Sequence, residues 1–247
     1  MLIPFLTHAW ASSPERLAIA AGVTLGFAAL ARALRGVNRS GALAGGLACF
    51  LLFAGTGPVA FATLAALFVM TWISTRLGYR RKLALGVAER REGRTAWQVL
   101  ANLAVAALGS VVYGVTGNQV WLVAALAALT EAATDTVASE IGQYSRAESR
   151  MITTWQRVPA GTDGGITIPG SVAGLAAGLT ITAVASVGGI LSLTQFWIPV
   201  AAGFAGMLID SVLGATLQRR GWISNQAVNF FSTLAAAALA YAIFLLT

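Results

Sequence analysis

Charged residues are scarce in this chain. Asp, Glu, Lys and Arg make up only 10% of its 247 residues, whereas hydrophobic residues make up 57% and the mean hydropathy is +0.76. Soluble domains usually carry about a quarter charged residues, so this chain could not cover its own surface in water. The composition excludes a soluble globular protein and predicts an integral membrane protein.

Cysteine and histidine each occur once, which excludes two other kinds of site. Cys49 has no partner for an internal disulfide. His8 has no second His or Cys at ligand spacing, so a zinc site is not expected. Residues 1–10 are apolar but lack the basic start and the small-residue cleavage site of a secretory signal, so we expect no cleaved leader.

Long apolar runs dominate the sequence, and a helix that crosses the hydrocarbon needs about 20 such residues. We predict an all-α, polytopic integral membrane protein with about eight transmembrane helices (range six to eight), in a single transmembrane domain over residues 1–247. The second and third spans are joined by so few residues that they could instead form a hairpin that does not fully cross. The predicted spans are 15–34, 40–56, 58–75, 96–114, 119–138, 167–190, 196–217 and 227–246.

Basic residues alternate between the connections. From the first loop to the seventh, Arg and Lys number 3, 0, 7, 0, 3, 0 and 2. Cytoplasmic loops of membrane proteins collect basic residues, so the odd-numbered loops are predicted to face the cytoplasm and both termini the outside. The same rule explains the net charge of +7 without a nucleic-acid partner.

Glycines recur every four residues in three of the predicted spans. Small residues at this spacing let helix backbones approach closely, so we interpret these glycines as packing positions. The three sets are Gly22/Gly26, Gly41/Gly45 and Gly170/Gly174/Gly178.

Five of the nine acidic residues are predicted at or near the cytoplasmic ends of helices, or in the fifth loop. A four-residue spacing places Glu131, Asp135 and Ser139 on one helix face. Carboxylates this close repel one another unless a cation or an arginine compensates, and Mg²⁺ prefers oxygen ligands of this kind. The alternative is that they pair with loop arginines. The five acids are Glu131, Asp135, Glu140, Asp163 and Asp210.

A glycine-rich turn precedes the sixth span, with the sequence Gly161-Thr162-Asp163-Gly164-Gly165. Glycine frees the backbone to turn its N–H groups towards an anion, and a helix N-terminus adds partial positive charge. We therefore expect a phosphate here. Asn225 and Asn229 lie four apart at the entrance of the eighth span, where amides either bind a ligand or bridge helices.

These residues predict a charged, phosphate-binding site at the cytoplasmic membrane surface, which suits transfer between a soluble phosphate compound and a lipid. Phosphoryl transfer needs Mg²⁺ and arginines to neutralise charge, and in-line positioning of the two reactants. The residues leave a kinase, a nucleotidyltransferase and a phosphatase open. The other class is a secondary transporter of an anionic substrate, whose acids should lie near the bilayer midplane.

Several blocks of sequence resemble the hallmark blocks of the transmembrane protein 19 family (domain of unknown function 92), which includes the plant phytyl-phosphate kinase. The resemblance covers about residues 15–246. Asp163 stands where that family more often has Asn, and Val137 where it more often has Trp. The blocks are DTVASEIG at 135–142, GTDGGIT at 161–167, DSVLGATLQ at 210–218, QVLAN at 98–102 and NQAVNF at 225–230.

The resemblance implies a Mg²⁺-dependent, membrane-embedded kinase. It would transfer a phosphoryl group from a nucleoside triphosphate, preferably CTP, to a prenyl monophosphate such as phytyl, geranylgeranyl or farnesyl phosphate. The alternative acceptor is a prenyl alcohol. The expected partners are the prenyl-phosphate lipid, the nucleotide and the surrounding membrane lipid.

On this hypothesis each candidate residue has an expected role. Asp135, Glu140 and Asp210 would bind Mg²⁺, and the turn of Gly161, Thr162, Asp163, Gly164 and Gly165 would bind the donor phosphates. Arg157 and Arg94 would neutralise charge, with Asn225 and Asn229 as further ligands of the nucleotide. The prenyl tail would lie between helices along the glycine-rich sixth span.

Overall fold

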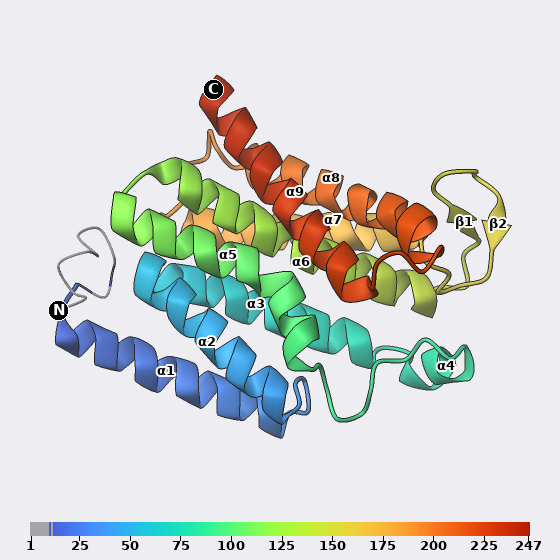
Figure 1. Cartoon of the computed structure of the whole chain (residues 1–247), viewed down its shortest axis with the longest axis horizontal. Helices are drawn as coiled ribbons and strands as arrows, with labels where there is room; N and C mark the ends of the chain where they lie inside the picture. Colours follow the sequence, from blue (N-terminus) through green and yellow to red (C-terminus); the bar gives the residue numbers. More distant parts are fainter. Residues whose placement is uncertain (1–9, 11) are drawn as a thin grey trace.

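The computed structural model describes residues 10 and 12–247, so His8 and most of the N-terminal segment considered for a signal lie outside the described residues. Eight long helices run up and down through this part of the chain (Figure 1). All eight are long and apolar enough to cross a membrane, the second and third included. They are α1 Pro14–Ala33, α2 Arg39–Thr56, α3 Pro58–Arg76, α5 Ala96–Thr116, α6 Gln119–Tyr144, α7 Ile168–Val187, α8 Trp197–Leu213 and α9 Asn225–Leu246.

The predicted eight-helix fold is therefore confirmed, and local sequence explains where most helices begin. A side-chain oxygen just before the helix accepts a backbone N–H of the first turn, which satisfies a donor that the helix cannot. Between α2 and α3 the chain reverses at Gly57, whose φ of 88° is unfavourable for other residues. The capping residues are Ser13, Asn38, Thr95, Asn118, Thr167 and Ser224.

Helix α6 lies at the centre of the bundle and packs against α3, α5, α7, α8 and α9. Nearly all of its first eighteen residues are buried, whereas α1 lies at the edge and packs mainly on α2 (Figure 1). Any polar group on α6 therefore has to find its partner inside the protein.

Glycines bring α7 close to α6, as the sequence predicts. A Cβ atom at Gly170 would lie 2.5 Å from the Ala138 carbonyl oxygen, and one at Gly174 would lie 2.6 Å from that of Thr134. The prediction is wrong for Gly22 and Gly26 of α1, because no atom of the described chain lies within 4 Å of a Cβ built at either. These two glycines face outwards at the edge of the bundle.

Two connections that sequence patterns left as loops contain short elements. The third contains α4, Tyr79–Ala84, and the fifth contains three antiparallel strands in the order β2-β1-β3. In this fifth connection, β1 is Ser149–Met151, β2 is Arg157–Val158 and β3 is Gly165–Ile166. Each strand is only two or three residues long, too short for an alternating pattern to reveal it.

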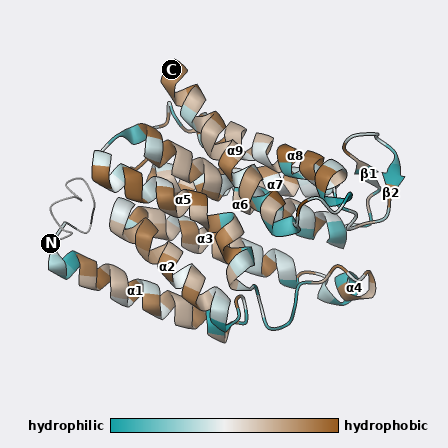
Figure 2. Ribbon diagram, viewed as in Figure 1, coloured by the Kyte–Doolittle hydropathy of each residue, from teal (hydrophilic) through white to brown (hydrophobic). Residues whose placement is uncertain are grey.

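Helix α6 ends six residues later than the predicted span. Its last turns carry Ser139, Glu140 and Gln143, so hydropathy fades while the helix continues. As a consequence Glu131, which we expected near the helix end, lies halfway along α6. The connections rich in basic residues all lie at the end of the bundle that carries α4 and the sheet, and β2 is among its most hydrophilic segments (Figure 2).

Close approach of α6 and α7 predicts the effect of enlarging Gly174. Gly174→Val should lower the free energy of unfolding by about 2 kcal/mol, because the valine would overlap the α6 backbone. For a chain of this size that corresponds to a fall in melting temperature of roughly 2–4 °C per kcal/mol. Thermal unfolding of detergent-purified protein measures it.

The matched control is Gly22→Val, which places the same side chain at an open helix position and should leave the melting temperature within about 1 °C of the parent protein, as surface substitutions usually do. Equal losses in the two variants would contradict the packing of α6 on α7.

Candidate functional site

A polar pocket of about 390 Å³ opens at the end of the bundle where α5, α7 and α9 begin and α6 and α8 end. Its volume lies within the range of small-molecule sites. Helices enter it with their N-terminal, partly positive ends from three directions, an arrangement that favours an anionic ligand. The lining comes from residues 87–102, 135–143, 149, 160–171, 207–218 and 225–229.

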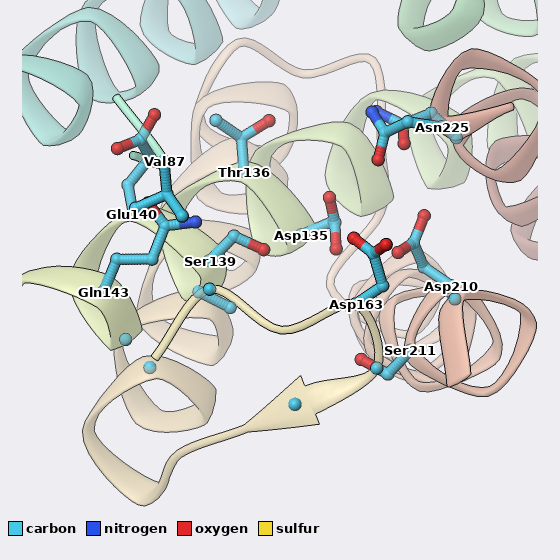
Figure 3. Close-up of a pocket in the computed structure, with 18 of the residues that line it drawn as sticks. Val87, Asp135, Thr136, Ser139, Glu140, Gln143, Asp163, Asp210, Ser211 and Asn225 are labelled. Carbon is cyan, nitrogen blue, oxygen red and sulfur yellow. The ribbon is translucent and has the colours of Figure 1, made fainter. Parts of the chain in front are cut away.

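Three aspartates from separate elements face this pocket. Asp135 comes from α6, Asp210 from α8 and Asp163 from the turn before β3, and their carboxyl groups point towards the same space (Figure 3). Four ion pairs are present in the described chain, and none involves these three residues. Ser232 donates a hydrogen bond to Asp210 Oδ2 over 3.3 Å. Carboxylates near a membrane interior that lack a cationic partner usually mark a functional site.

Amide groups lie beside the carboxylates in the pocket. Asn225, Gln226 and Asn229 of α9 line it, and their side chains make no hydrogen bond within the described chain. Ser224 caps the N–H of Ala227, which leaves the first N–H groups of α9 free to bind a ligand. Asn225 faces the aspartates across the opening (Figure 3). These donors suit the oxygen atoms of a phosphate or a sugar.

Two left-handed glycines shape the turn before α7. Gly161 has a φ of 83° and Gly164 a φ of 77°. Gly164 also packs directly on α8, since a Cβ there would lie 2.4 Å from the Cβ of Ala215. At this contact α8 widens into a π-helical turn, η2, over Gly214–Gln218, and such turns are frequent at functional sites. The turn is therefore fixed against the helix that carries Asp210.

The first turn of α7 offers fewer N–H groups than its position suggests. Thr167 Oγ1 accepts the N–H of Gly170, and Pro169 has no N–H at all. Phosphate oxygens would therefore meet the glycine turn itself and the start of α9 rather than the α7 terminus.

At Asp163, desolvation raises the pKa of the carboxyl, and the positive charge of Arg219 lowers it in part.

Arg94 is held in place by its backbone. Its N–H donates to Gly36 O and its carbonyl accepts from the N–H of Asn38, each over 3.0 Å, so the loop before α2 clamps it. Gly41 leaves room for this, because a Cβ there would collide with the Arg94 carbonyl. The side chain lines the pocket, and its Nε lies 3.9 Å from Glu89 Oε2. The backbone bridge thus places this arginine at the pocket.

Two of the candidate residues are placed differently from the rest. Arg157 lies on β2, is 75% exposed, pairs with Glu148 at 2.7 Å and does not line the pocket. Glu140 lines the pocket but lies away from the three aspartates (Figure 3). It forms an ion pair with Lys82 and accepts a hydrogen bond from Thr75 Oγ1.

Lys82 is the main feature that sequence reasoning missed. It is buried, and its Nζ also donates to the carbonyl oxygens of Ser74 and Thr75. The available signal was that it is the one lysine beside fifteen arginines. Glu89 of the third connection also lines the pocket, and it accepts a hydrogen bond from Gln98 Nε2.

The donor set fits Mg²⁺ held together with a nucleotide. The described residues contain no group of three or more His, Cys, Asp or Glu arranged as a complete metal site. Mg²⁺ in phosphate-binding proteins is usually held by one or two carboxylates plus the substrate phosphates. Asp135 and Asp210 can supply such carboxylates, with Asp163 beside them.

Comparison with protein families agrees with the sequence blocks. Residues 22–237 match the family described as integral membrane protein DUF92. The chain belongs to this family. It is an integral membrane protein, and the resemblance noted from its sequence blocks is confirmed.

Three relatives illustrate the breadth of the family. The chain is 33% identical to an uncharacterized membrane protein of Synechocystis over 78% of this chain and 77% of the relative. It is 30% identical to one of Methanocaldococcus jannaschii over 81% and 82%. It is 29% identical to protein VTE6, chloroplastic, of Arabidopsis thaliana over 78% of this chain and 61% of the plant protein. No solved structure matches.

The buried ion pair predicts a large effect at Lys82. Lys82→Met should cost about 3–5 kcal/mol of stability, because it leaves Glu140 without its cation. The double variant with Glu140→Gln should recover most of the loss. Melting temperature and detergent-extracted yield measure both, and a Lys82→Met protein as stable as the parent would contradict a structural ion pair.

Proposed function

We propose that this protein is a membrane-embedded phosphotransferase that moves a phosphoryl group from a nucleoside triphosphate, preferably CTP, to a prenyl monophosphate. The observation that carries the proposal is the pocket itself. Aspartates on α6 and α8, which form no ion pair within the described chain, line the pocket together with amides of α9 and with Arg94, at the end of a bundle of apolar helices. The family match and the similarity to protein VTE6 support a prenyl-phosphate acceptor.

On this proposal the two sides of the pocket have separate tasks. The glycine turn 161–165 and the α9 amides of Asn225 and Asn229 bind the triphosphate. Asp135 and Asp210 would hold Mg²⁺, which when bound neutralises charge on the phosphates. Arg94 orients the acceptor phosphate beside the donor. Catalysis then consists mainly of positioning and charge neutralisation.

The transfer step balances without a strong general base. An oxygen of the prenyl monophosphate attacks the terminal phosphorus of the nucleotide, a new P–O bond forms, and the bond to the bridging oxygen breaks. The products are a prenyl diphosphate and a nucleoside diphosphate. A phosphate monoester is largely doubly ionised near neutral pH, so its oxygen attacks without first losing a proton. From the positive-inside rule we expect this pocket to face the cytoplasm.

A radiolabelled transfer assay on purified protein tests the proposal. The reaction contains γ-labelled CTP or ATP, Mg²⁺ and a panel of prenyl monophosphates and prenyl alcohols. Label in a prenyl diphosphate is the expected result and identifies donor and acceptor together. Label on alcohols only would assign the alternative acceptor. No transfer by folded protein would reject a kinase.

Carboxylate variants test the proposed metal ligands. Asp135→Asn and Asp210→Asn should each lower kcat/KM by roughly a hundredfold, because each removes a charge that neutralisation of the phosphates depends on. Chelation should abolish transfer and added Mg²⁺ should restore it. Glu148→Gln is the control, since Glu148 pairs with Arg150 and Arg157 outside the pocket. Full activity in both aspartate variants would reject the metal site.

One observation favours a secondary transporter of an anion as the second candidate. Glu131 lies halfway along α6, is 1% exposed, and neither carboxyl oxygen has a hydrogen-bond partner in the described chain. Gly206 of α8 packs against it, since a Cβ there would lie 2.6 Å from Glu131 Cγ. A carboxyl group at mid-depth is what a proton-coupled carrier requires.

Glu131→Gln distinguishes the two candidates. Glu131 does not line the pocket, so the variant should keep at least about half of the transfer activity, an effect within a factor of 2, or under 0.5 kcal/mol. A carrier should instead lose uptake of radiolabelled orthophosphate or CTP into proteoliposomes. Uptake by the parent protein that the variant lacks, together with no transfer by either, would favour the transporter.

A further inference from the structure

A second cavity, of about 500 Å³, lies between α1, α2, α3 and α5. Its walls are apolar along most of their length, with Phe27 and Ala31 of α1, Leu64 and Phe68 of α3 and Leu103 of α5 among the lining residues. Gly45 and Gly46 of α2 open the space, because they present no side chain to it. Its size lies in the range of ligand sites rather than of packing defects.

This cavity adjoins the polar pocket. Glu89, Arg94 and Asn102 line both spaces, so Arg94 lies where the two come together. A molecule with an anionic head and an apolar tail could therefore place its head at Arg94 and its tail among the helices.

The mouth of the cavity is basic. Arg76 stacks on Trp72 with 4.4 Å from guanidinium carbon to ring centroid, and Trp72 Nε1 donates to Leu34 O over 3.1 Å. Arg35 has a φ of 55°, a conformation that costs a non-glycine residue about 1–2 kcal/mol. The basic residues at this mouth are Arg35, Arg76, Arg90, Arg91 and Arg94. Their charge complements a phosphate head group.

The cavity is elongated along the helix axes. Its lining on α3 extends from Leu64 to Arg76, about 18 Å at the rise of an α-helix. That is more than half of the roughly 30 Å thickness of the hydrocarbon layer. Between α1 and α3 the wall contains the edge-on rings of Phe27 and Phe68, whose centroids are 5.3 Å apart.

We propose that this cavity between α1, α2, α3 and α5 is the binding site for the isoprenoid tail of the acceptor, with the acceptor phosphate at Arg94. The inference rests on the proposed kinase function and adds the place of the lipid. It replaces the expectation that the tail lies along α7, whose glycine face is filled by α6.

Filling the cavity tests the inference by kinetics. A Cβ at Gly45 would lie 3.6 Å from Val99 Cγ1, an ordinary contact, so Gly45→Leu adds its bulk to the open space. KM for geranylgeranyl monophosphate should rise about tenfold or more, because the tail loses apolar burial of about two methylenes. KM for CTP and for the short acceptor dimethylallyl monophosphate should stay the same. Gly22→Leu, at an open position of α1, is the matched control.

Photolabelling of the unaltered protein tests the same site without relying on a variant or on turnover. A geranylgeranyl monophosphate with a diazirine at the end of its tail is irradiated with the protein, and the labelled peptides are identified. Label within 27–46 and 64–76 that excess geranylgeranyl monophosphate displaces supports the inference, with or without transfer activity. Label on α7, or label that is not displaced, in protein that transfers phosphate would overturn the tail site and leave the kinase intact. Neither label nor transfer would overturn both.

Discussion

Carboxyl groups on the central helix impose the constraint on which the rest of the site depends. Helix α6 is surrounded by five other helices, yet it carries Glu131, Asp135 and Glu140. An ionised carboxylate with little water needs a cation close by. Lys82 supplies one for Glu140, whereas Asp135 has no ion pair within the described chain and faces Asp210 across the pocket. Lys82 thus compensates Glu140 within the protein, whereas on the proposed function Mg²⁺ would compensate Asp135 and Asp210.

The connections at this end of the bundle serve the same arrangement. Helix α4 places Lys82 against the end of α6. The ammonium group donates there to two backbone carbonyl oxygens and to the Glu140 carboxylate. The backbone bridge between the 34–38 loop and Arg94 fixes the backbone of this arginine beside the two cavities. The three short strands fix the turn that bears Asp163, since β3 follows it directly. Each of these connections positions one charged residue, namely Lys82, Arg94 or Asp163, that does not belong to a membrane-spanning helix.

Hydropathy was sufficient for the helices but only partly for the site. Eight apolar runs separated by capped turns predict eight helices because a helix in lipid has to satisfy its own backbone. The structure brings Asp135, Asp210 and the 161–165 turn to one pocket, and they could be selected from the sequence because carboxylates and glycines are conspicuous in it. Lys82 was not assigned to Glu140, because 58 residues separate them and no local pattern encodes the contact. Glu131 was predicted near the end of its helix, but it lies halfway along α6. The last turns of α6 are polar, so hydropathy does not reveal where the helix ends.

Joining two cavities of opposite character at one arginine explains why a kinase of this kind would be a membrane protein. On the proposed function the polar pocket would bind the water-soluble nucleotide where helices end, and the apolar cavity between α1 and α3 would hold the tail at the depth of the hydrocarbon layer. A lipid phosphate cannot leave the bilayer without exposing its tail, at about 0.8 kcal/mol for each methylene. A site that keeps the tail within the hydrocarbon layer and binds only the phosphate at Arg94 would avoid that cost. The acceptor phosphate and the nucleotide would then meet at the membrane surface, which both substrates can reach.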